Sequence, residues 1–210
     1  GTSEYGQNTD TSRPFGLGPS AAITTVALAD VTVAPSSIFE TLGYIFVCAG
    51  RYVYRIDPAT NTATLSKDFG AGVVAVMGMR WETDIGLVCT DAATLSLWKV
   101  TVIGSPDTLT QTADVVAYRL AAGINRLYKI SKTGVLKQIA TALDPMVEAN
   151  WADEVQVGDT ISAPTGMVAY ERTVFVAKQE GIFGVGEEGF GVPFVRRVDR
   201  NTNTGKGMVV

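Results

Sequence analysis

Six carboxylates lie near expected turns of the chain, where they would be accessible for acid–base chemistry. They are Asp84, Asp91, Asp153, Glu154, Glu187 and Glu188. Two carboxylates held about 5–10 Å apart can hydrolyse a glycosidic bond. No pair among the six stands out, and turns collect aspartate because its side chain bonds the local backbone. We therefore assign no catalytic residue and expect no enzymatic activity.

The chain contains no histidine. This excludes Ser-His-Asp and Cys-His nucleophile pairs, histidine-ligated zinc, a proximal histidine for haem and a histidine proton switch. Acid–base catalysis would depend on carboxylates, lysine or tyrosine. The alternating Asp or Asn residues of a calcium loop are also missing from the sequence. We therefore expect no metal site.

Two glycine patterns resemble phosphate-binding loops. Residues 184–189 read GVGEEG, and residues 70–75 read GAGVVA. Such a loop holds a dinucleotide only where it follows a strand and opens a helix. Neither pattern is followed by a helix start, and Glu187 and Glu188 would repel phosphate. We expect no cofactor.

The densest basic group consists of Arg196, Arg197 and Arg200, followed by Lys206. The net charge of −4 argues against a general nucleic-acid binder. We expect this group to lie in solvent or to contact a partner chain.

Cys48 and Cys89 each lie in an apolar run. Two cysteines in 210 residues do not form a disulfide scaffold. We expect two buried free thiols, and a disulfide between neighbouring elements is the alternative.

The elements that would position these residues are strands. The β-branched residues valine (26), threonine (24) and isoleucine (11) together far outnumber leucine (12), and 22 residues are glycine. This balance favours strands and tight turns over helices. The apolar share of 46% supports a core, and the charged share of 18% is low. The composition predicts an all-β protein.

Three windows of 13 residues align without gaps. They are 44–56 (YIFVCAGRYVYRI), 118–130 (YRLAAGINRLYKI) and 173–185 (TVFVAKQEGIFGV). Each has an apolar run, a polar or glycine-containing turn, and a second run with a central aromatic residue. A fourth copy, residues 85–100, fits with three extra turn residues. Each window predicts a β-hairpin.

Further strands flank these hairpins. The pattern predicts strands after them at residues 62–66, 135–140 and 190–195, and before them at 73–81 and 165–170. The repeating unit therefore has about four antiparallel strands. We expect the third unit to be short of a strand and residues 141–160 to be an insertion. Asp144 and Pro145 would start a short helix there, as N-cap and first helical residue.

One aromatic residue anchors each window: Tyr54, Trp98, Tyr128 and Phe183. The intervals between them are 44, 30 and 55 residues. Their mean is typical of a propeller blade, which has about 40–50 residues. We expect these rings in core layers rather than on a stacking platform.

These features resemble those of β-propeller proteins over roughly residues 35–195. The best examples are IFVCAGRYVYRIDPATN (residues 45–61) and VFVAKQEGIFGVGEEG (residues 174–189). The resemblance implies a body of four-stranded antiparallel units. The Trp-Asp and Gly-His signatures of WD repeats are missing from the sequence. A β-sandwich or an irregular β-barrel is the alternative fold.

The organisation along the chain follows from these patterns. We expect an extended N-terminal arm over residues 1–22 and a β-repeat body over residues 23–198. The body would comprise units near residues 35–69, 70–113, 114–160 and 161–198. The polar segment 199–210 would continue into a longer protein. The sequence has no apolar run long enough to span a membrane and no signal peptide.

We expect a non-enzymatic structural or interaction protein that acts by assembly with other protein subunits, as a homo- or hetero-oligomer. Its composition is similar to that of bacteriophage virion components of the tail, neck or spike, which implies a virion or extracellular location. A carbohydrate-directed enzyme or ligand-binding module of propeller type is one alternative. A cellular protein-binding propeller is the other.

Overall fold

Strands make up nearly all of the regular structure. The computed structural model describes residues 9–10, 18–19, 26–28, 31–82, 84–92, 96–102, 108–111, 115–188 and 192–199. Within these residues the only helix is the short 3-10 helix η1 (Glu148–Asn150). The predicted all-β class is confirmed.

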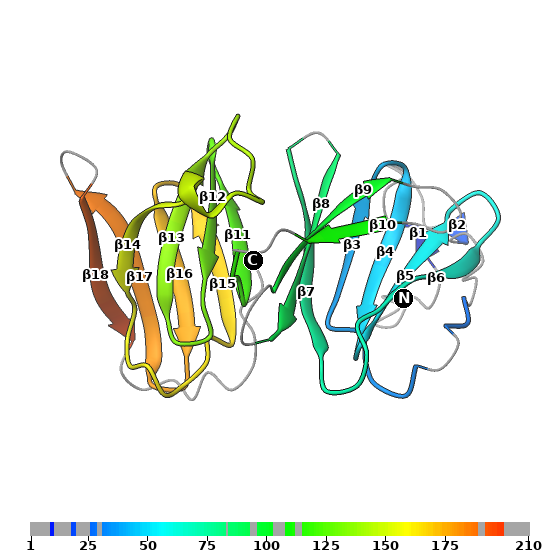
Figure 1. Cartoon of the computed structure of the whole chain (residues 1–210), viewed down its shortest axis with the longest axis horizontal. Coiled ribbons are helices and arrows are strands. Elements are labelled where there is room, and N and C mark those ends of the chain that lie inside the picture. Colours follow the sequence, from blue (N-terminus) through cyan, green and yellow to red (C-terminus); the bar gives the residue numbers. More distant parts are fainter. Residues whose placement is uncertain are drawn as a thin grey trace.

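Sixteen of the strands form four antiparallel sheets, each built from four strands that are consecutive in the chain (Figure 1). The first sheet contains β3 (Ser37–Thr41), β4 (Tyr44–Ala49), β5 (Tyr52–Asp57) and β6 (Thr62–Asp68). The second contains β7 (Val74–Trp81), β8 (Ile85–Asp91), β9 (Leu97–Val102) and β10 (Thr108–Gln111). The third contains β11 (Arg119–Gly123), β12 (Arg126–Ile130), β13 (Val135–Ala140) and β14 (Ala152–Gln156). The fourth contains β15 (Gly166–Tyr170), β16 (Thr173–Lys178), β17 (Gly181–Glu188) and β18 (Val192–Asp199).

Two very short strands precede the sheets. β1 (Thr9–Asp10) pairs antiparallel with β2 (Gly18–Pro19). The rest of the expected arm over residues 1–22 lies outside the described residues, as do residues 200–210 of the polar C-terminal segment. The boundaries of the four units stay a prediction.

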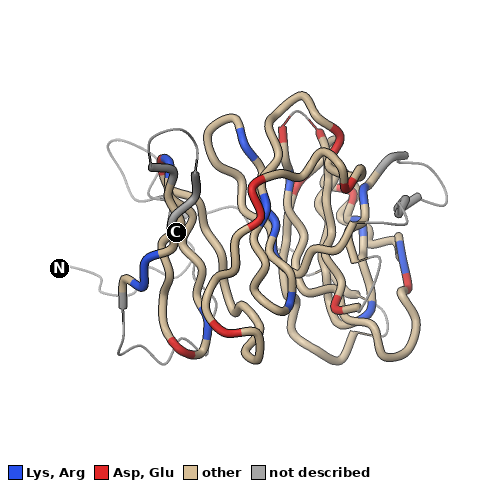
Figure 2. The backbone as a smooth tube through the Cα atoms, turned by 60° about the vertical axis from the view of Figure 1, so that its left-hand side comes forward, with Lys and Arg blue, Asp and Glu red and all other residues tan. Residues whose placement is uncertain are grey.

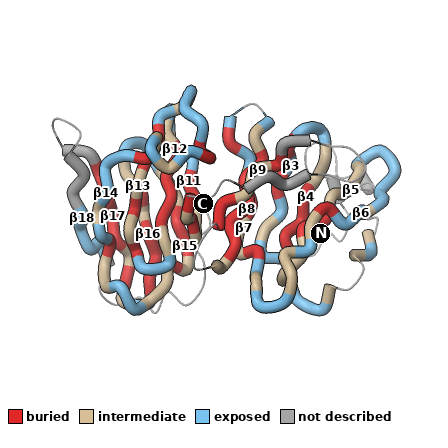
Figure 3. Tube along the Cα trace, viewed as in Figure 1, coloured by how far each residue is buried: buried red, intermediate tan, exposed pale blue. Residues whose placement is uncertain are grey.

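Consecutive sheets pack against one another through their faces. The first strands contact each other in order, β3 with β7, β7 with β11, and β11 with β15. Figure 3 shows buried residues along the strands and exposed residues at the turns. Within the described residues, three core clusters join the first sheet to the second, the second to the third, and the third to the fourth. Because alternate side chains of a strand point to opposite faces, the second and third sheets bury both of their faces.

At the first junction, between the first and second sheets, aromatic rings pack against strand positions that are occupied by glycine. Phe39 and Phe46 of the first sheet stack with their ring centroids 5.5 Å apart. A Cβ atom at Gly78 of β7 would lie 2.7 Å from Cδ1 of Phe39, and one at Gly86 of β8 would lie 3.2 Å from Cε2. Position 78 must be glycine because Phe39 occupies the space that a side chain would fill. At position 86 a Cβ atom would meet Cγ2 of Thr41 (2.8 Å) and Cγ2 of Val100 (3.0 Å) before it met Phe39.

Polar side chains also cross the junctions. Ser36 Oγ donates to the Ala75 carbonyl (2.6 Å) between the first and second sheets. Ser96 Oγ donates to the Ala117 carbonyl (2.9 Å) and accepts from its N–H (2.7 Å). Arg119 donates to the carbonyl of Val76 in β7, the first strand of the second sheet (2.8 Å). It also donates to the carbonyl of Pro164, just before β15, the first strand of the fourth sheet (3.5 Å). The arginine therefore ties three consecutive sheets together near their first strands.

A register shift recurs between the third and fourth strands of each sheet. In the first to fourth sheets, respectively, the shift falls at Val53/Tyr54, Thr108/Leu109, Leu136/Gln138 and Ile182/Phe183. Such a β-bulge increases the local twist of the sheet. The four sheets therefore share a geometric detail as well as a strand order.

The expectation that the third unit lacks a strand is wrong. Its window 118–130 covers the first and second strands, β11 and β12, whereas the other windows cover the second and third strands. The strand that seemed missing is β14, which pairs with β13 after the segment 141–151. Period-2 alternation looks the same in any hairpin. The alignment therefore placed the window 118–130 on the first two strands of its sheet instead of the second and third.

The strand register also explains the uneven spacing of the aromatic anchors. Tyr54, Trp98 and Phe183 lie on third strands, opposite Val47, Val88 and Val176 of second strands. Tyr128 lies on a second strand, and the third-strand position of that sheet is Ile139, opposite Leu127. The intervals between Tyr54, Trp98, Ile139 and Phe183 are 44, 41 and 44 residues. All four predicted anchors are buried or half-buried, so their assignment to core layers is confirmed.

The helix expected at Asp144 and Pro145 is displaced. Asp144 Oδ1 accepts the Met146 N–H (2.9 Å), as an N-cap would, but it closes a turn. The 3-10 helix begins four residues later, at Glu148. The segment then places Trp151 in the second core, where its indole N–H donates to the Pro145 carbonyl (2.9 Å).

The two cysteines are free and buried, as predicted. Cys48 belongs to the first core and Cys89 to the second. Burial raises the pKa of the Cys48 thiol to about 11 and also raises that of Cys89.

Native protein at pH 8 is therefore expected to react with a thiol reagent far more slowly than a free thiol does, because the thiolate is the reactive form. Both cysteines should react at once in denaturant. A thiol titration with and without guanidinium measures this. Rapid native reaction of either thiol would contradict the buried placement.

Substitution Gly78→Ala should destabilise the fold by about 1–3 kcal/mol, because the added methyl group overpacks the core against Phe39. Gly184→Ala is the matched control. Its Cβ would meet Phe175 at an ordinary 3.6 Å, so that variant should be neutral or more stable by up to about 1 kcal/mol. Urea unfolding of both variants measures the difference, and equal stabilities would refute the account of the first junction.

Candidate functional site

The two ends of the sheet array differ in construction. One end, which we call the linker face, carries the turns between second and third strands and the segments that join consecutive sheets. Its described segments include residues 50–51, 69–73, 131–134, 157–165 and 179–180. The opposite end, the turn face, carries the turns between first and second strands, such as residues 124–125 and 171–172.

A hollow of about 470 Å³ lies on the linker face. It is lined by Asp91, Ala92, Val116, Ser131, Lys132, Thr133, Thr160 and Ile161. A second hollow of about 250 Å³ shares Val116, Ser131 and Thr133 with it. Together they span the loop ends of the second, third and fourth sheets, so a ligand here would contact three sheets at once.

Lys132 and Asp91 form an ion pair across the first hollow. Lys132 Nζ lies 2.7 and 2.8 Å from the two carboxylate oxygens. The hydrogen bond to Asp91 raises the pKa of Lys132. The pair joins the β12–β13 turn to the end of β8.

Two further lysines share a carboxylate in the second hollow. Glu148 accepts hydrogen bonds from the buried Lys129 and from Lys137 (3.0 Å), and Lys137 also pairs with Glu154 (3.1 Å). Burial lowers the pKa of Lys129, while the hydrogen bond that Lys129 donates to Glu148 opposes that shift. The Lys129 ammonium also lies 4.8 Å from the centre of the Trp151 ring. These charges are paired with one another, which is typical of a structural network.

The segment that enters the fourth sheet is held by a buried lysine. Lys178 is 0% exposed and donates to the carbonyls of Val157 (3.1 Å) and Asp159. Its ammonium also lies 3.6 Å from Asp159 Oδ1. The Asp159 N–H donates to Glu180 Oε1 (2.7 Å). Because a buried ammonium is costly unless its bonds are satisfied, this arrangement fixes the path of the backbone.

Asp159 continues the same network toward the surface. Its Oδ1 accepts from the Ile161 N–H (3.0 Å), the Ser162 N–H (2.8 Å) and the Ser162 hydroxyl (2.8 Å). The hydrogen bond from the Ser162 backbone is the main reason that the pKa of Asp159 is lowered. Ile161, which these bonds hold in place, is 92% exposed at the edge of the larger hollow.

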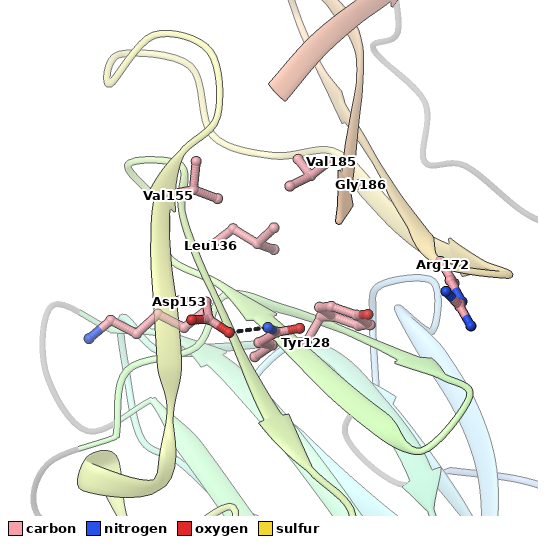
Figure 4. A pocket seen from close by; sticks show the side chains of 9 residues that line it. Tyr128, Leu136, Asp153, Val155, Arg172, Val185 and Gly186 are labelled. Atoms are coloured by element: carbon pink, nitrogen blue, oxygen red, sulfur yellow. Dashed lines mark hydrogen bonds between the residues drawn. The ribbon is translucent and has the colours of Figure 1, made fainter. Parts of the chain in front are cut away.

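A smaller cavity lies between the third and fourth sheets (Figure 4). Its volume of about 20 Å³ has room for about one water molecule. Gln138, which lies opposite Tyr128 in the strand register, donates to Asp153, and Arg172 lies farther away on the fourth-sheet side (Figure 4). This cavity is too small for a metabolite.

The structure does not bring the predicted carboxylates together. Asp84 lies on the turn face and pairs with Arg80 (3.5 Å). Asp91, Asp153 and Glu154 are bonded to Lys132, Gln138 and Lys137, respectively. Glu187 and Glu188 belong to β17, and their side chains lie outside the described residues. The carboxylates with described side chains therefore serve separate local contacts.

The glycine patterns do not form phosphate loops. Residues 184–188 continue strand β17, and residues 70–73 form a turn in which Gly70 and Gly72 have positive φ. Neither pattern opens a helix, as expected.

The basic group is exposed where it is described. Arg196 and Arg197 lie on β18, and Arg197 donates to the Glu180 carbonyl. Arg200 and Lys206 lie outside the described residues. Figure 2 shows basic and acidic positions interspersed over the body. In the described part of the chain, no group of three or more His, Cys, Asp or Glu residues could hold a metal ion. No helix there has the length and apolarity of a membrane span.

Sequence reasoning missed the residues that shape the linker face, namely Lys129, Asp159, Ile161 and Lys178. One signal was available. In the aligned windows, Lys178 falls opposite Ala49, directly after the apolar run of residues 174–177. A lysine at a repeat position that is expected to be buried needs hydrogen-bond partners, and it therefore indicates a polar network nearby.

Comparison with known proteins adds information on the fold. The sequence matches no protein-family model and no curated protein. Its structure is similar to a chain of the Mitotic Checkpoint Complex, with a TM-score of 0.52 and 9% identity, over 85% of this chain and 61% of that one. It is similar to BBS1N, solved in complex with ARL6DN, with a TM-score of 0.51 and 13% identity, over 78% and 52%.

A third similar structure is PorZ, a surface component of the type-IX secretion system of Porphyromonas gingivalis. Its TM-score is 0.51 at 12% identity, over 77% of this chain and 22% of PorZ. The chain thus spans less than two thirds of each of these three proteins. At such identities the likeness concerns the fold alone. Together with the four-stranded antiparallel sheets, these propeller-type neighbours show a β-propeller-like fold.

Proposed function

We propose that this protein is a non-enzymatic interaction module that binds other protein subunits through its linker face. The observation that carries the proposal is Ile161, a large apolar side chain that is 92% exposed on a loop whose backbone donates two hydrogen bonds to the Asp159 carboxylate, which also accepts one from the Ser162 hydroxyl. Because the backbone that carries Ile161 is held in place before binding, less entropy is lost in ordering the loop, which favours its use as an anchor in a protein interface.

The surroundings of Ile161 suit a protein partner. The adjacent hollow is lined by the hydroxyl groups of Ser131, Thr133 and Thr160, with Val116 among them. An apolar anchor beside a polar rim is the usual composition of a protein interface. The carboxylates with described side chains are engaged in separate contacts, which gives no support to a glycosidase. PorZ is a component of a secretion system, BBS1N was solved in complex with ARL6DN, and the third neighbour is a chain of the Mitotic Checkpoint Complex, all of which is compatible with this proposal.

A virion or extracellular setting, with a role in a phage tail, neck or spike, rests on composition. Its supports are the low share of charged residues and the polar, glycine-containing N-terminal segment. Purified virions would test it directly: the setting requires this chain among their proteins by mass spectrometry.

Substitution Ile161→Asp should weaken partner binding by about 30-fold or more, the loss of an anchor worth about 2 kcal/mol. Tagged wild-type and variant proteins would be recovered from extracts of the source organism, and co-purified proteins quantified by mass spectrometry. Ile124→Asp is the matched control, because Ile124 is 73% exposed on the turn face. Equal recovery by wild type and Ile161→Asp would contradict the proposed interface.

The anchor loop should also weaken in acid. The native pKa of Asp159 lies below its usual 3.8, so its contribution to stability is full above that pH and is lost as the pH falls further. Asp159→Asn should therefore lose less of its unfolding free energy between pH 5 and pH 2.5 than wild type does. Urea unfolding at each pH measures this. Asp84→Asn, in an exposed ion pair on the turn face, is the control. If Asp159→Asn lost as much unfolding free energy between pH 5 and pH 2.5 as wild type does, the role given to this carboxylate would be refuted.

A further inference from the structure

Ile161 lies beside a hollow that can receive the same side chain from another molecule. It is 92% exposed at the edge of the hollow of about 470 Å³ on the linker face. That volume is larger than an isoleucine side chain, and the half-buried Val116 adds an apolar group to the lining. One surface of the chain therefore carries both an exposed apolar side chain and a hollow of the size that admits it.

The uncharged polar groups of this hollow can pair with identical groups. Ser131, Thr133 and Thr160 supply hydroxyls, and a hydroxyl both donates and accepts hydrogen bonds. Each hydroxyl can therefore bond to a hydroxyl of another copy of the chain. A surface that offered only donors or only acceptors could not pair with itself in this way.

The charges around the hollow are balanced as well. Among the described residues that line it, the charged ones are Lys132 and Asp91, whose paired side chains are 58% and 34% exposed. The adjoining smaller hollow is lined by two lysines and two glutamates. Two copies of this surface would therefore meet without a net repulsion, and Lys132 of one copy could face Asp91 of the other.

We propose that the linker face binds a second copy of this chain, so that Ile161 of each copy enters the larger hollow of the other. This inference rests on the proposed function, because it names the partner of the same face. The two copies are related by a twofold axis, so a contact of one residue with another is made twice, once in each direction. The same symmetry places Lys132 of each copy beside Asp91 of the other and forms two ion pairs between the chains.

Light scattering during size-exclusion chromatography tests the self-association. Wild type should have twice the chain mass of 22.2 kDa at micromolar concentration, and Ile161→Asp should have the single chain mass. The new carboxylate would be buried in the hollow of the other copy, where Lys132 is already paired, and such burial is costly. Ile124→Asp is the matched control, because Ile124 is 73% exposed on the turn face, and it should keep the double mass.

Two results of that experiment would overturn the inference. A wild type of single chain mass at all concentrations would show that no second copy binds. A double mass that Ile161→Asp leaves unchanged would place the contact elsewhere on the chain. The first result is distinguishable from a failure of the proposed function, because recovery of other proteins from extracts through Ile161 would support that function while refuting self-association.

An exchange of charges between two variants tests which groups face each other. Lys132→Glu alone would set carboxylates against each other across the twofold axis, and Asp91→Lys alone would set ammonium groups against each other. Each variant should therefore have the single chain mass. Both should stay folded, because the pair lies at the surface, where an ion pair contributes little to stability.

An equimolar mixture of the two variants should recover the double mass. The new carboxylate of one variant then faces the new ammonium group of the other, and the native Asp91 of the first faces the native Lys132 of the second. A mixture that keeps the single chain mass would overturn the proposed contact, as would a double mass of either variant alone.

Discussion

The whole structure depends on one packing contact, the burial of a sheet face against the next sheet. A four-stranded sheet with apolar residues on both faces is not stable alone in water, because each face must be removed from solvent. The second and third sheets, which have apolar residues on both faces, are therefore each packed between two neighbours. The first core shows how specific this contact is: Phe39 packs against β7 at a position where Gly78 lacks a side chain.

Polar groups set the angle at which the sheets meet. Arg119 donates to carbonyls on both sides of the third sheet, and Ser96 bonds both backbone groups of Ala117. Lys178 satisfies the carbonyls of the segment that enters the fourth sheet. Apolar burial has little directional preference, whereas a buried polar group is stable only with its partner in place. These bonds therefore select one arrangement of the sheets among those that would bury similar area, and the same bonds shape the linker face that we propose as the interface.

Much of the fold could be predicted from local pattern. Alternation identified the hairpins around Val47 and Val176, and the Asp-Pro turn after Ile56 marked the end of a third strand. The third unit was misjudged because Tyr128 carries the same local pattern on a different strand. Only the pairing of Leu127 with Ile139 reveals its position, and pairing is a long-range property. The candidate site was less predictable. Lys178 and Asp159 come together from separate segments, and Ile161 is notable only for its exposure, which the sequence does not encode locally.

The recurring bulge has a consequence for solubility. Each fourth strand is the outermost strand of its sheet, and its free edge could pair with the edge of another molecule. A bulge beside that strand twists it and breaks the regular spacing of its outward-facing N–H and C=O groups. A foreign strand would then find few groups in register. The bulge therefore disfavours amyloid-like addition of strands at the sheet edges, while the sheet faces can still pack against one another.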